Sequence, residues 1–526
     1  GQRGARRQRQ GPAGGAAVRL APLGELATRH AVAFRFRAIG DRVLVTNPEG
    51  RWLLLTADEF DAYTRDRVPA DSPLHARLAG ANFLADHYDL RAAVEMVRAR
   101  KRFVHHGPNL HMAVVTLRCN ETCVYCHASR ADMDAVHTDM TREVAEQTVD
   151  FIFKTTSPFV TIEFQGGEPL VNFPVVQHLI EYALDKNRAA QKQLEFTMVS
   201  NLAMMDDAKL EYLLSKKVQL CISIDGPAPL HDKQRVLPMA SSYDHASRWI
   251  KRINDAYAAA GLDPTLYHVE ALLTTTRATL PQWKEVVDTY VALGCRALFL
   301  RPIDPFGFAA KTGPKLEYPR REYLEFYRRA VDYMIELHGR GTEILERYAS
   351  IFLTKILGGV DPNFLDVRWP AGAGLGALAY GYDGRIFTCD EGRMLDAMGD
   401  DAFAIGHVAT SSYRDVVGHE TVRAVTIASN LDATPDCVDC TYQPYCGVPP
   451  SHSYKTQGTI FGRMRESALC EVYKGIQDYL FEKLATGDAA TRATLERWTT
   501  HRPREHFLQD AAGSPGPGTK PVAPRP

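Results

Sequence analysis

Short apolar runs alternate with longer amphipathic segments through the middle of the chain. Such runs are typical of buried strands, and the segments between them are predicted to be helical. Strands are predicted at 112–117, 160–164, 196–199, 220–224, 269–273 and 298–300, and helices at 141–154, 174–185, 245–260 and 280–293. Repeated β-α units of this kind form a parallel sheet with helices outside. With about six units in place of eight, the pattern predicts an α/β fold on a partial TIM-like barrel, (β/α)6.

The remaining regions flank this barrel. Strands near 33–37, 42–46 and 52–56, then helices at 57–67 and 73–78, predict a small N-terminal α+β module, with Phe83 completing its core. We divide the chain into a disordered start, the N-terminal module, the barrel, a C-terminal domain and a disordered tail, at 1–30, 31–105, 106–340, 341–500 and 501–526. The two ends have biased compositions, Arg, Gln, Gly and Ala at the start and Gly and Pro at the finish.

Composition and charge exclude several classes of protein. A chain of 526 residues with 45% hydrophobic content is large enough for two or three domains with cores. Its net charge of −1 gives no basic field to hold nucleic acid. No apolar stretch approaches the roughly 20 residues of a membrane span, and 13–20 is too short and glycine-rich for a signal peptide. We expect a cytoplasmic protein, in which ten cysteines indicate metal ligation more than disulfides.

Three of these cysteines form the most informative motif. Cys119, Cys123 and Cys126 have the spacing C-x3-C-x2-C and follow a predicted strand. Three thiolates fill three of the four iron sites of a [4Fe-4S] cluster, which leaves one iron open to a reactant. A zinc site or a disulfide framework is the alternative, but tetrahedral zinc needs a fourth ligand. His127 adjoins Cys126 too closely to supply it, and we expect His127 to lie beside the loop or face solvent.

This motif, with the aromatic Tyr125 before the last cysteine, resembles the signature of the radical S-adenosylmethionine (SAM) superfamily. The resemblance implies that the open iron binds the amino and carboxylate groups of SAM. It further implies that an electron from the cluster cleaves SAM to a 5′-deoxyadenosyl radical, which abstracts hydrogen from a substrate. The cofactor supplies the chemistry, and the protein orients the substrate.

A second motif fits the same ligand. The strand at 160–164 ends in Gly166, Gly167, Glu168 and Pro169. Glycines allow close backbone approach, and a glutamate accepts hydrogen bonds from an ammonium group. By itself this string is an ordinary turn. One β-α unit after the cysteine loop, it resembles the GGEP motif that holds the SAM amino group in the family.

Later strand ends supply further polar residues. The resemblance implies contacts of Ser200, Ser223 and Asp225 with the ribose and carboxylate of SAM. Arg235 resembles an arginine that pairs with the SAM carboxylate. Its alternative is a solvated surface arginine, which is equally compatible with the sequence.

The C-terminal third carries a second cysteine set. Cys221 and Cys295, beside predicted strands, are interpreted as core residues. Asp383-Gly384 between apolar runs at 377–382 and 385–389 predicts a hairpin. Beyond it lie four spaced cysteines, Cys437, Cys440, Cys446 and Cys470. A structural zinc ribbon would use the same spacing.

This region resembles the auxiliary-cluster region called SPASM, found in radical SAM enzymes that modify ribosomally made peptides and proteins. The resemblance implies that the four cysteines hold one auxiliary [4Fe-4S] cluster. For a second cluster only Cys389 matches, and Pro450 stands where another cysteine is expected, so we predict one. Asp390 corresponds to an aspartate that acts as general base in sulfatase-maturing relatives. A hydrogen-bonded or solvated turn aspartate is the alternative.

Over nearly its whole length the chain resembles the His-Xaa-Ser system radical SAM maturases. Strings that carry this include Leu110 to Cys119, Ile162 to Leu170, Phe299 to Pro302 and Gln443 to Gly447. The resemblance implies a precursor peptide as substrate, a second radical SAM maturase as partner and a flavodoxin- or ferredoxin-like reductant. The expected reaction is an oxidative link on a peptide side chain. Alternatives are a sulfatase-maturase-like enzyme that oxidises proteins, and a metal-stabilised peptide-docking protein without turnover.

The N-terminal module loosely resembles winged-helix elements that present a strand edge to a leader peptide. The alternative is a domain that only packs on the barrel.

Overall fold

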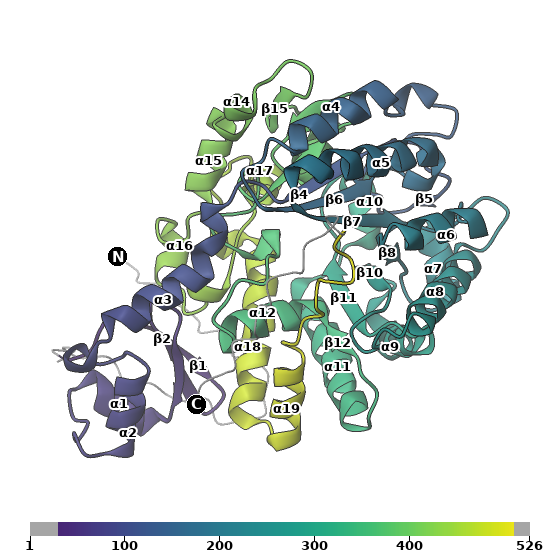
Figure 1. The fold of residues 1–526 in the computed structure, drawn as a ribbon. Helices are drawn as coiled ribbons and strands as arrows, with labels where there is room; N and C mark the ends of the chain where they lie inside the picture. The colour runs from purple at the N-terminus through teal and green to yellow at the C-terminus, as the bar shows by residue number, and fades with distance from the viewer. Residues whose placement is uncertain (1–29, 510–526) are drawn as a thin grey trace, which may run out of the picture.

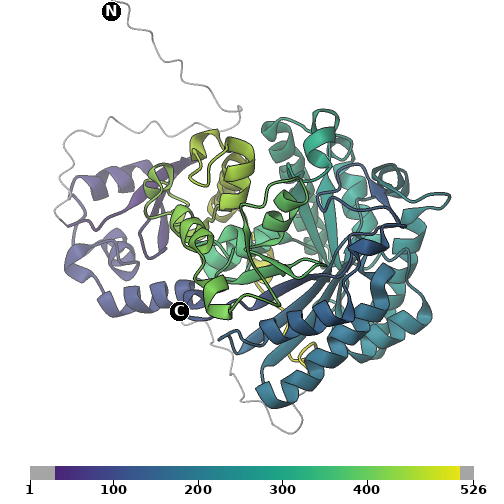
Figure 2. The same ribbon diagram turned by 90° about the horizontal axis from the view of Figure 1, so that it is seen from above.

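The computed structural model describes residues 30–509, so most of the expected disordered start and the end of the tail lie outside the described residues. One mixed sheet organises the molecule. Its strand order is β12-β11-β10-β8-β7-β6-β4-β13-β14-β15, and every pair from β12 to β13 is parallel. Figures 1 and 2 show helices α4, α5, α8 and α9 outside this sheet. The predicted α/β architecture with a mostly parallel sheet is confirmed.

The six predicted barrel strands are all present. They are β4 (Leu110–Val114), β6 (Phe159–Gln165), β7 (Gln193–Ser200), β8 (Gln219–Ser223), β10 (Glu270–Thr275) and β11 (Ala297–Pro302). The first begins and ends earlier than predicted. Val115 still donates to the Gln165 carbonyl of β6, but Leu117 turns away and donates to the Thr138 carbonyl. The apolar side chains between the sheet and its outer helices form the main core.

The outer helices include four that the sequence pattern did not predict, α6, α7, α10 and α11. The helices of the barrel region are α4 (Arg142–Ile152), α5 (Phe173–Ala190), α6 (Asp207–Ser215), α7 (Ala228–Gln234), α8 (Ser242–Ala259), α9 (Trp283–Ala292), α10 (Ala309–Leu316) and α11 (Arg320–Gly339). Helix α6 has a buried face of Leu210 and Leu213 and an Asp206 cap that accepts from the Lys209 N–H. Its short length hides this periodicity in the sequence.

The C-terminal region extends the same sheet on both sides. Strand β12 (Leu345–Glu346) pairs with β11, while β13 (Ala377–Tyr380) pairs with β4 and continues into β14 (Arg385–Phe387) and β15 (Ala404–His407). The predicted hairpin is therefore present as β13 and β14. The other helices here are α12 (Arg347–Leu357), α13 (Asp390–Asp396), α14 (Tyr413–Val417), α15 (Glu420–Ala428), α16 (Pro435–Val438), α17 (Pro450–Gln457), α18 (Ala468–Thr486) and α19 (Ala489–Arg497). The sheet thus crosses the boundary expected at 340.

Residues 501–509 are ordered against the barrel, so the expectation of a disordered tail from residue 501 is wrong for this stretch. Phe507 is buried beside Tyr257 and Tyr267. Arg504 makes a bidentate contact with Glu195, at 2.9 and 2.6 Å. Burial of an aromatic ring and this charge pairing outweigh the entropy of ordering a proline-containing segment.

The N-terminal module is a three-stranded antiparallel sheet followed by helices. It comprises β1 (Arg35–Ile39), β2 (Arg42–Thr46), β3 (Trp52–Leu55), α1 (Ala57–Thr64), α2 (Pro73–Gly80) and α3 (Leu90–Lys101). Thr56 and Glu59 form a capping box that fixes the start of α1. On the β3 edge, Arg77 donates to the Leu54 carbonyl at 2.9 Å. Phe83 belongs to the buried core of the module, as predicted.

Arg100 joins this module to the C-terminal region. Its buried guanidinium donates to the carbonyls of Pro444, Gly50 and Lys355 at 2.7, 3.0 and 2.9 Å. Tyr445 stacks near it, with 5.1 Å from the guanidinium carbon to the ring centre. Because these carbonyls come from three distant parts of the chain, one side chain fixes how the parts pack.

Replacing Arg100 with methionine is therefore expected to destabilise the protein by about 3 kcal/mol, because buried carbonyls lose their donors. Urea unfolding followed by circular dichroism measures this change. The matched variant Arg98→Met, on the exposed side of the same helix, should change stability by less than about 0.5 kcal/mol. Equal losses in the two variants would contradict the joining role of Arg100.

No helix among residues 30–509 is long and apolar enough to cross a membrane.

Candidate active site

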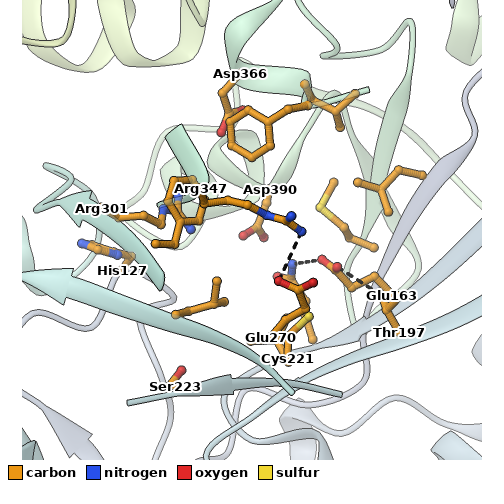
Figure 3. A pocket seen from close by; sticks show the side chains of 18 of the residues that line it. His127, Glu163, Thr197, Cys221, Ser223, Glu270, Arg301, Arg347, Asp366 and Asp390 are labelled. Atoms are coloured by element: carbon orange, nitrogen blue, oxygen red, sulfur yellow. Dashed lines mark hydrogen bonds and ion pairs between the residues drawn. The ribbon is translucent and has the colours of Figure 1, made fainter. Parts of the chain in front are cut away.

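A cavity of about 780 Å³ lies at the sheet and reaches the cysteine loop. Its wall includes side chains of β6, β7, β8, β10 and β11, the loop around Cys126, the hairpin residues Cys389 and Asp390, and the C-terminal residues Arg502 and Arg504. Figure 3 shows Arg301 and His127 on one side of the cavity and Glu163 and Thr197 on the other. Segments separated by hundreds of residues thus build one site.

The cysteine loop is held by a small strand pair. Strand β5 (Thr122–Cys123) pairs with β9 (Arg235–Val236), and Val124 donates to the Gln234 carbonyl at 2.9 Å. On the other side, Phe308 donates to the Cys126 carbonyl at 2.7 Å. Arg393 also donates to the Ala128 carbonyl at 3.1 Å. Anchors from several elements therefore fix the loop that carries the thiols.

The three thiols of this loop lie close enough to affect one another. Burial raises the pKa of Cys119 and of Cys123, and the neighbouring thiols of the set raise both further. Two donors approach the sulfurs: Asn201 Nδ2 lies 3.8 Å from Cys119 Sγ, and Arg235 Nη1 lies 3.8 Å from Cys123 Sγ. Converging soft donors with amide and guanidinium groups beside them fit the ligand set of a cluster that carries negative charge.

Gly166 and Gly167 allow the next strand end to pack on this loop. A Cβ atom at Gly166 would lie 2.2 Å from the Thr116 carbonyl oxygen. At Gly167 it would lie 2.4 Å from the carbonyl oxygens of both Leu117 and Arg118. The backbone N–H of Gly167 donates to the Thr116 carbonyl at 2.8 Å. Glycine is thus required for a steric reason, and the motif is more than an ordinary turn.

Glu168 connects the ends of β6 and β7. Its carboxylate accepts from the Asn201 N–H at 2.8 Å, the Leu170 N–H at 3.0 Å and the Ser200 hydroxyl at 2.8 Å. Burial raises the pKa of Glu168 to about 7, against these hydrogen bonds, which lower it. Glu168 lines the cavity, followed by the buried Pro169. Ser200 also lines the cavity, but its hydroxyl is directed to Glu168.

Asp225 lies behind the cysteine loop and is not among the cavity-lining residues found within 30–509. It is fully buried and accepts from Tyr125 Oη and from Gln234 Nε2, the latter at 2.9 Å. Arg235 Nε is 3.2 Å from Asp225 Oδ2. Only 8% of the surface of Arg235 is exposed, so Arg235 is not a solvated surface arginine. Asp225 therefore orients Tyr125 and Arg235, both of which line the cavity.

The expectation that Cys221 is a core residue is wrong. Cys221 lines the cavity between Glu163 and Glu270, because alternate positions of β8 face the cavity and the core, whereas Cys295 is buried in the core as predicted. Of the two positions expected for His127, the structure shows the one beside the loop and not the solvent-facing one, and His127 Nε2 accepts from the Asp304 N–H at 3.3 Å. Burial, with the charge of Arg301, lowers the pKa of His127 to about 3.

The cavity also holds charged groups that sequence reasoning missed. Glu163 accepts from Gln165 at 2.6 Å and from Thr197 at 3.2 Å, and Arg347 lies 3.2 Å from Glu270 (Figure 3). Polar and apolar residues visibly alternate along these strands in the sequence, but the interior of such a barrel is normally filled by apolar side chains. Ser223 lines the cavity.

Asp390 begins α13 at the cavity wall and is paired with Arg393. Arg393 Nε donates to Asp390 Oδ1 at 2.8 Å, and Nη2 lies 2.8 Å from the same oxygen. The adjacent Cys389 thiol is buried, and burial together with the charge of Glu391 raises its pKa. Asp390 is therefore a hydrogen-bonded helix-start aspartate.

The four C-terminal cysteines gather at the start of α18. Burial, then the charges of Cys470 and Cys440, raises the pKa of Cys437 to about 12. The pKa of Cys446 is likewise raised by burial and by the other three thiols. Leu431, Val448, Met464 and Trp369 pack around the set. Burial also raises the pKa of Cys470, while the nearby charge of Lys474 opposes this rise.

Within residues 30–509, no group of three or more His, Cys, Asp or Glu side chains is placed to hold a single metal ion.

The profile of the Radical SAM superfamily matches residues 113–289, which include the cysteine loop, the glycine motif and Arg235. The chain thus contains a Radical SAM domain. This superfamily uses SAM and a [4Fe-4S] cluster, which together supply a carbon-centred radical, and the converging thiols of the domain fit that requirement.

Curated proteins are similar in sequence to this chain over a part that includes residues of the Radical SAM match. An uncharacterized protein of Archaeoglobus fulgidus is 24% identical over 387 residues, covering 73% of this chain and 83% of the relative. The cysteine-type anaerobic sulfatase-maturating enzyme of Clostridium perfringens is 24% identical over 250 residues, covering 45% and 63% respectively.

Solved structures share the fold. Native anSMEcpe with bound AdoMet has a TM-score of 0.59 and 17% identity, covering 73% of this chain and 100% of that one. Streptococcus suis SuiB bound to precursor peptide SuiA has a TM-score of 0.50 and 13% identity, covering 84% and 99%. The fold of this chain thus recurs in other proteins.

Proposed function

We propose that this chain is a radical SAM maturase that oxidatively modifies side chains of a ribosomally made precursor peptide of the His-Xaa-Ser type, by forming a crosslink. The observation that carries the proposal is the cavity. It joins the thiol loop and the Glu168 motif to a further space lined by Glu163, Arg301 and Arg347. A site for SAM alone does not need this additional wall of charged groups.

The proposal assigns the following roles. Cys119, Cys123 and Cys126 hold the cluster that binds SAM. Gly166, Gly167, Glu168 and Pro169 form the cradle for its amino group, with Ser200, Ser223 and Arg235 along the same wall. Tyr125 and Asp225 support this wall through the hydrogen bonds described above.

Cys437, Cys440, Cys446 and Cys470 hold one auxiliary [4Fe-4S] cluster in this proposal. Such a group accepts one electron when bound. The surrounding apolar side chains limit water access, which tunes the potential of the site. Zinc is the alternative occupant, and iron analysis distinguishes the two.

The comparisons support a peptide substrate. SuiB was solved with its precursor peptide SuiA, and anSMEcpe was solved with AdoMet and a peptide. We place the protein in the cytoplasm with a flavodoxin- or ferredoxin-like reductant and a second maturase as partners. The N-terminal module is the proposed leader-binding element. Arg77 donates to the Leu54 carbonyl at its β3 edge, and β1 at the other edge contacts the C-terminal region through Arg35 and Arg37.

A second candidate is a protein-oxidising enzyme similar to the sulfatase-maturating relative. Its support is Asp390, which corresponds to the aspartate expected from that resemblance. The contact with Arg393 weakens this candidate, because it occupies the Oδ1 atom of Asp390.

Mass spectrometry of a His-Xaa-Ser-type precursor co-expressed with the chain tests the proposal. We expect loss of two hydrogens on the peptide and production of 5′-deoxyadenosine. Formation of a formylglycine in a sulfatase-derived peptide instead would favour the second candidate. If reduced protein with both clusters does not cleave SAM, the chain is a docking protein and the proposal fails.

A further inference from the structure

Three carboxyl groups surround Arg301 where the main cavity meets a smaller one. Arg301, Asp366 and Glu391 line both the cavity of about 780 Å³ and the neighbouring cavity of about 270 Å³, and Asp304 lines the smaller one. The smaller cavity extends to the exposed residues Thr456 and Glu466. The carboxyl groups therefore lie between the proposed substrate site and the surface.

These carboxyl groups differ from the other acids of the cavity in their partners. Glu195, Glu270 and Asp390 are each paired with an arginine, while Glu121, Glu163 and Glu168 accept hydrogen bonds from neighbouring side chains or backbone N–H groups. Within residues 30–509, no basic side chain lies within 4 Å of an oxygen of Asp366 or Glu391, and the buried Asp304 Oδ1 has no hydrogen-bond partner. One guanidinium, that of Arg301, thus faces three carboxyl groups without a direct ion pair.

Burial, together with the crowding of like charges, favours the protonated form of these three groups. Burial and the charges of Asp366, Asp390 and Asp304 raise the pKa of Glu391 to about 8. Burial raises the pKa of Asp304 to about 6 and raises that of Asp366, while Arg301 opposes both. Such groups exchange protons near neutral pH as a set.

Charged and titratable groups reach this set from every element packed on it. They are Arg301 and Asp304 after β11, Arg320 of α11, Tyr348 of α12, Asp366 and Arg368 before the hairpin, Cys389, Asp390 and Arg393 at α13, His452 of α17, and Glu466 and Tyr473 beside and on α18. Burial lowers the pKa of His452 to about 4, so this ring is neutral. Acids outnumber the bases that face Glu391 itself.

We propose that Glu391 accepts the proton released when the substrate is oxidised, and that the smaller cavity leads this proton to solvent. The inference rests on the proposed function. One substrate hydrogen leaves as an atom to the 5′-deoxyadenosyl radical. When the new bond forms, the remaining electron passes to an iron–sulfur acceptor of the class proposed above, and the remaining proton passes to a carboxylate oxygen of Glu391.

Glu391 suits this role better than Asp390. Both begin α13 and both line the cavity, but Arg393 contacts Asp390 Oδ1 at 2.8 Å and ties it to the cysteine loop through Ala128. Glu391 has no such partner and opens onto a second cavity. A general base is most effective when its pKa lies near the working pH.

The first test measures the carboxyl group directly. Infrared titration of the anaerobically purified, cluster-containing protein should show a protonated carboxyl band that disappears near pH 8. This band should be absent in Glu391→Gln and retained in Asp390→Asn and in Glu420→Gln, which removes an exposed acid from the first turn of α15. A band that persists unchanged in Glu391→Gln overturns the proposal.

The second test separates proton acceptance from radical formation, with a His-Xaa-Ser-type precursor as the probe. In Glu391→Gln, 5′-deoxyadenosine formation should stay within about twofold, while modified peptide per deoxyadenosine falls about 100-fold. In wild type this ratio should rise with pH up to about 8, because the accepting form is the deprotonated one, and the variant should lose this rise.

Two further outcomes would contradict the role of Glu391. If Asp390→Asn loses the coupling and Glu391→Gln keeps it, Asp390 is the acceptor and the proposal is wrong. If wild type forms deoxyadenosine but leaves the peptide unchanged, the proposed substrate is wrong, and the proton-acceptor role falls with it even where the infrared band is found.

Discussion

Replacing Cys119, Cys123 and Cys126 together by alanine is expected to abolish SAM cleavage and to lower the iron content from about eight to about four per chain. The three thiols lie on one loop. The pairing of β5 with β9 and the Phe308 N–H bond to the Cys126 carbonyl hold this loop in place. No other cysteine among the described residues lines the cavity near them except Cys221 and Cys389, which lie on β8 and at the start of α13.

Anaerobic iron and sulfide analysis with Mössbauer spectra measures this change. Cys295→Ala, which alters a fully buried core thiol away from both sets, is the matched control and should keep all the irons. If wild type has about four irons that fall to none in the triple variant, with zinc present, the C-terminal cysteines are structural. Their proposed role as electron acceptor would then be wrong.

Replacing Gly167 by alanine is expected to lower the rate of SAM cleavage by at least about 100-fold, or about 2.7 kcal/mol in the barrier. The new Cβ would lie 2.4 Å from two carbonyl oxygens of the chain that leads into Cys119. Backbone cannot move aside as a flexible side chain does, so either Glu168 or the cysteine loop must shift. Displacement of catalytic groups by about 1 Å carries a cost of this size.

Anaerobic assay of 5′-deoxyadenosine and circular dichroism of the same samples separate loss of geometry from unfolding. Gly339→Ala is the matched control, because no atom lies within 4 Å of its Cβ position at the end of α11. We expect Gly167→Ala to remain folded, since overpacking costs about 1–3 kcal/mol. Normal SAM cleavage by a folded Gly167→Ala would show that the motif is not in the cradle.

Several elements of the fold could be predicted because their signals are local. The apolar runs of β6 and β7 and the Asp383-Gly384 turn predict their structures from neighbouring residues alone. Helix α6 is too short to show its periodicity clearly, and the pairing of β12 and β13 with opposite ends of the sheet depends on long-range contacts. Residues 501–509 were mistaken for disorder because the partner of Arg504 lies about three hundred residues away.

The candidate site divides in the same way. The spacing of Cys119, Cys123 and Cys126 and the Gly166-Gly167-Glu168 string marked it from sequence. The sequence did not show that Ser200 is bonded to Glu168, that Asp225 lies behind the loop, or that Cys221 faces the cavity. Each of these depends on which face of a strand meets which neighbour.

By itself, the sequence determined the β-α order, the presence of two cysteine sets and the glycine motif between loop and sheet. These follow from periodicity and spacing, which act between residues close in the chain. Only the tertiary structure decided that Arg393 neutralises Asp390 while Glu391 stays without an ion pair between two cavities. Burial and charge pairing set the chemistry of a carboxyl group, and both depend on segments that meet only when the chain has folded.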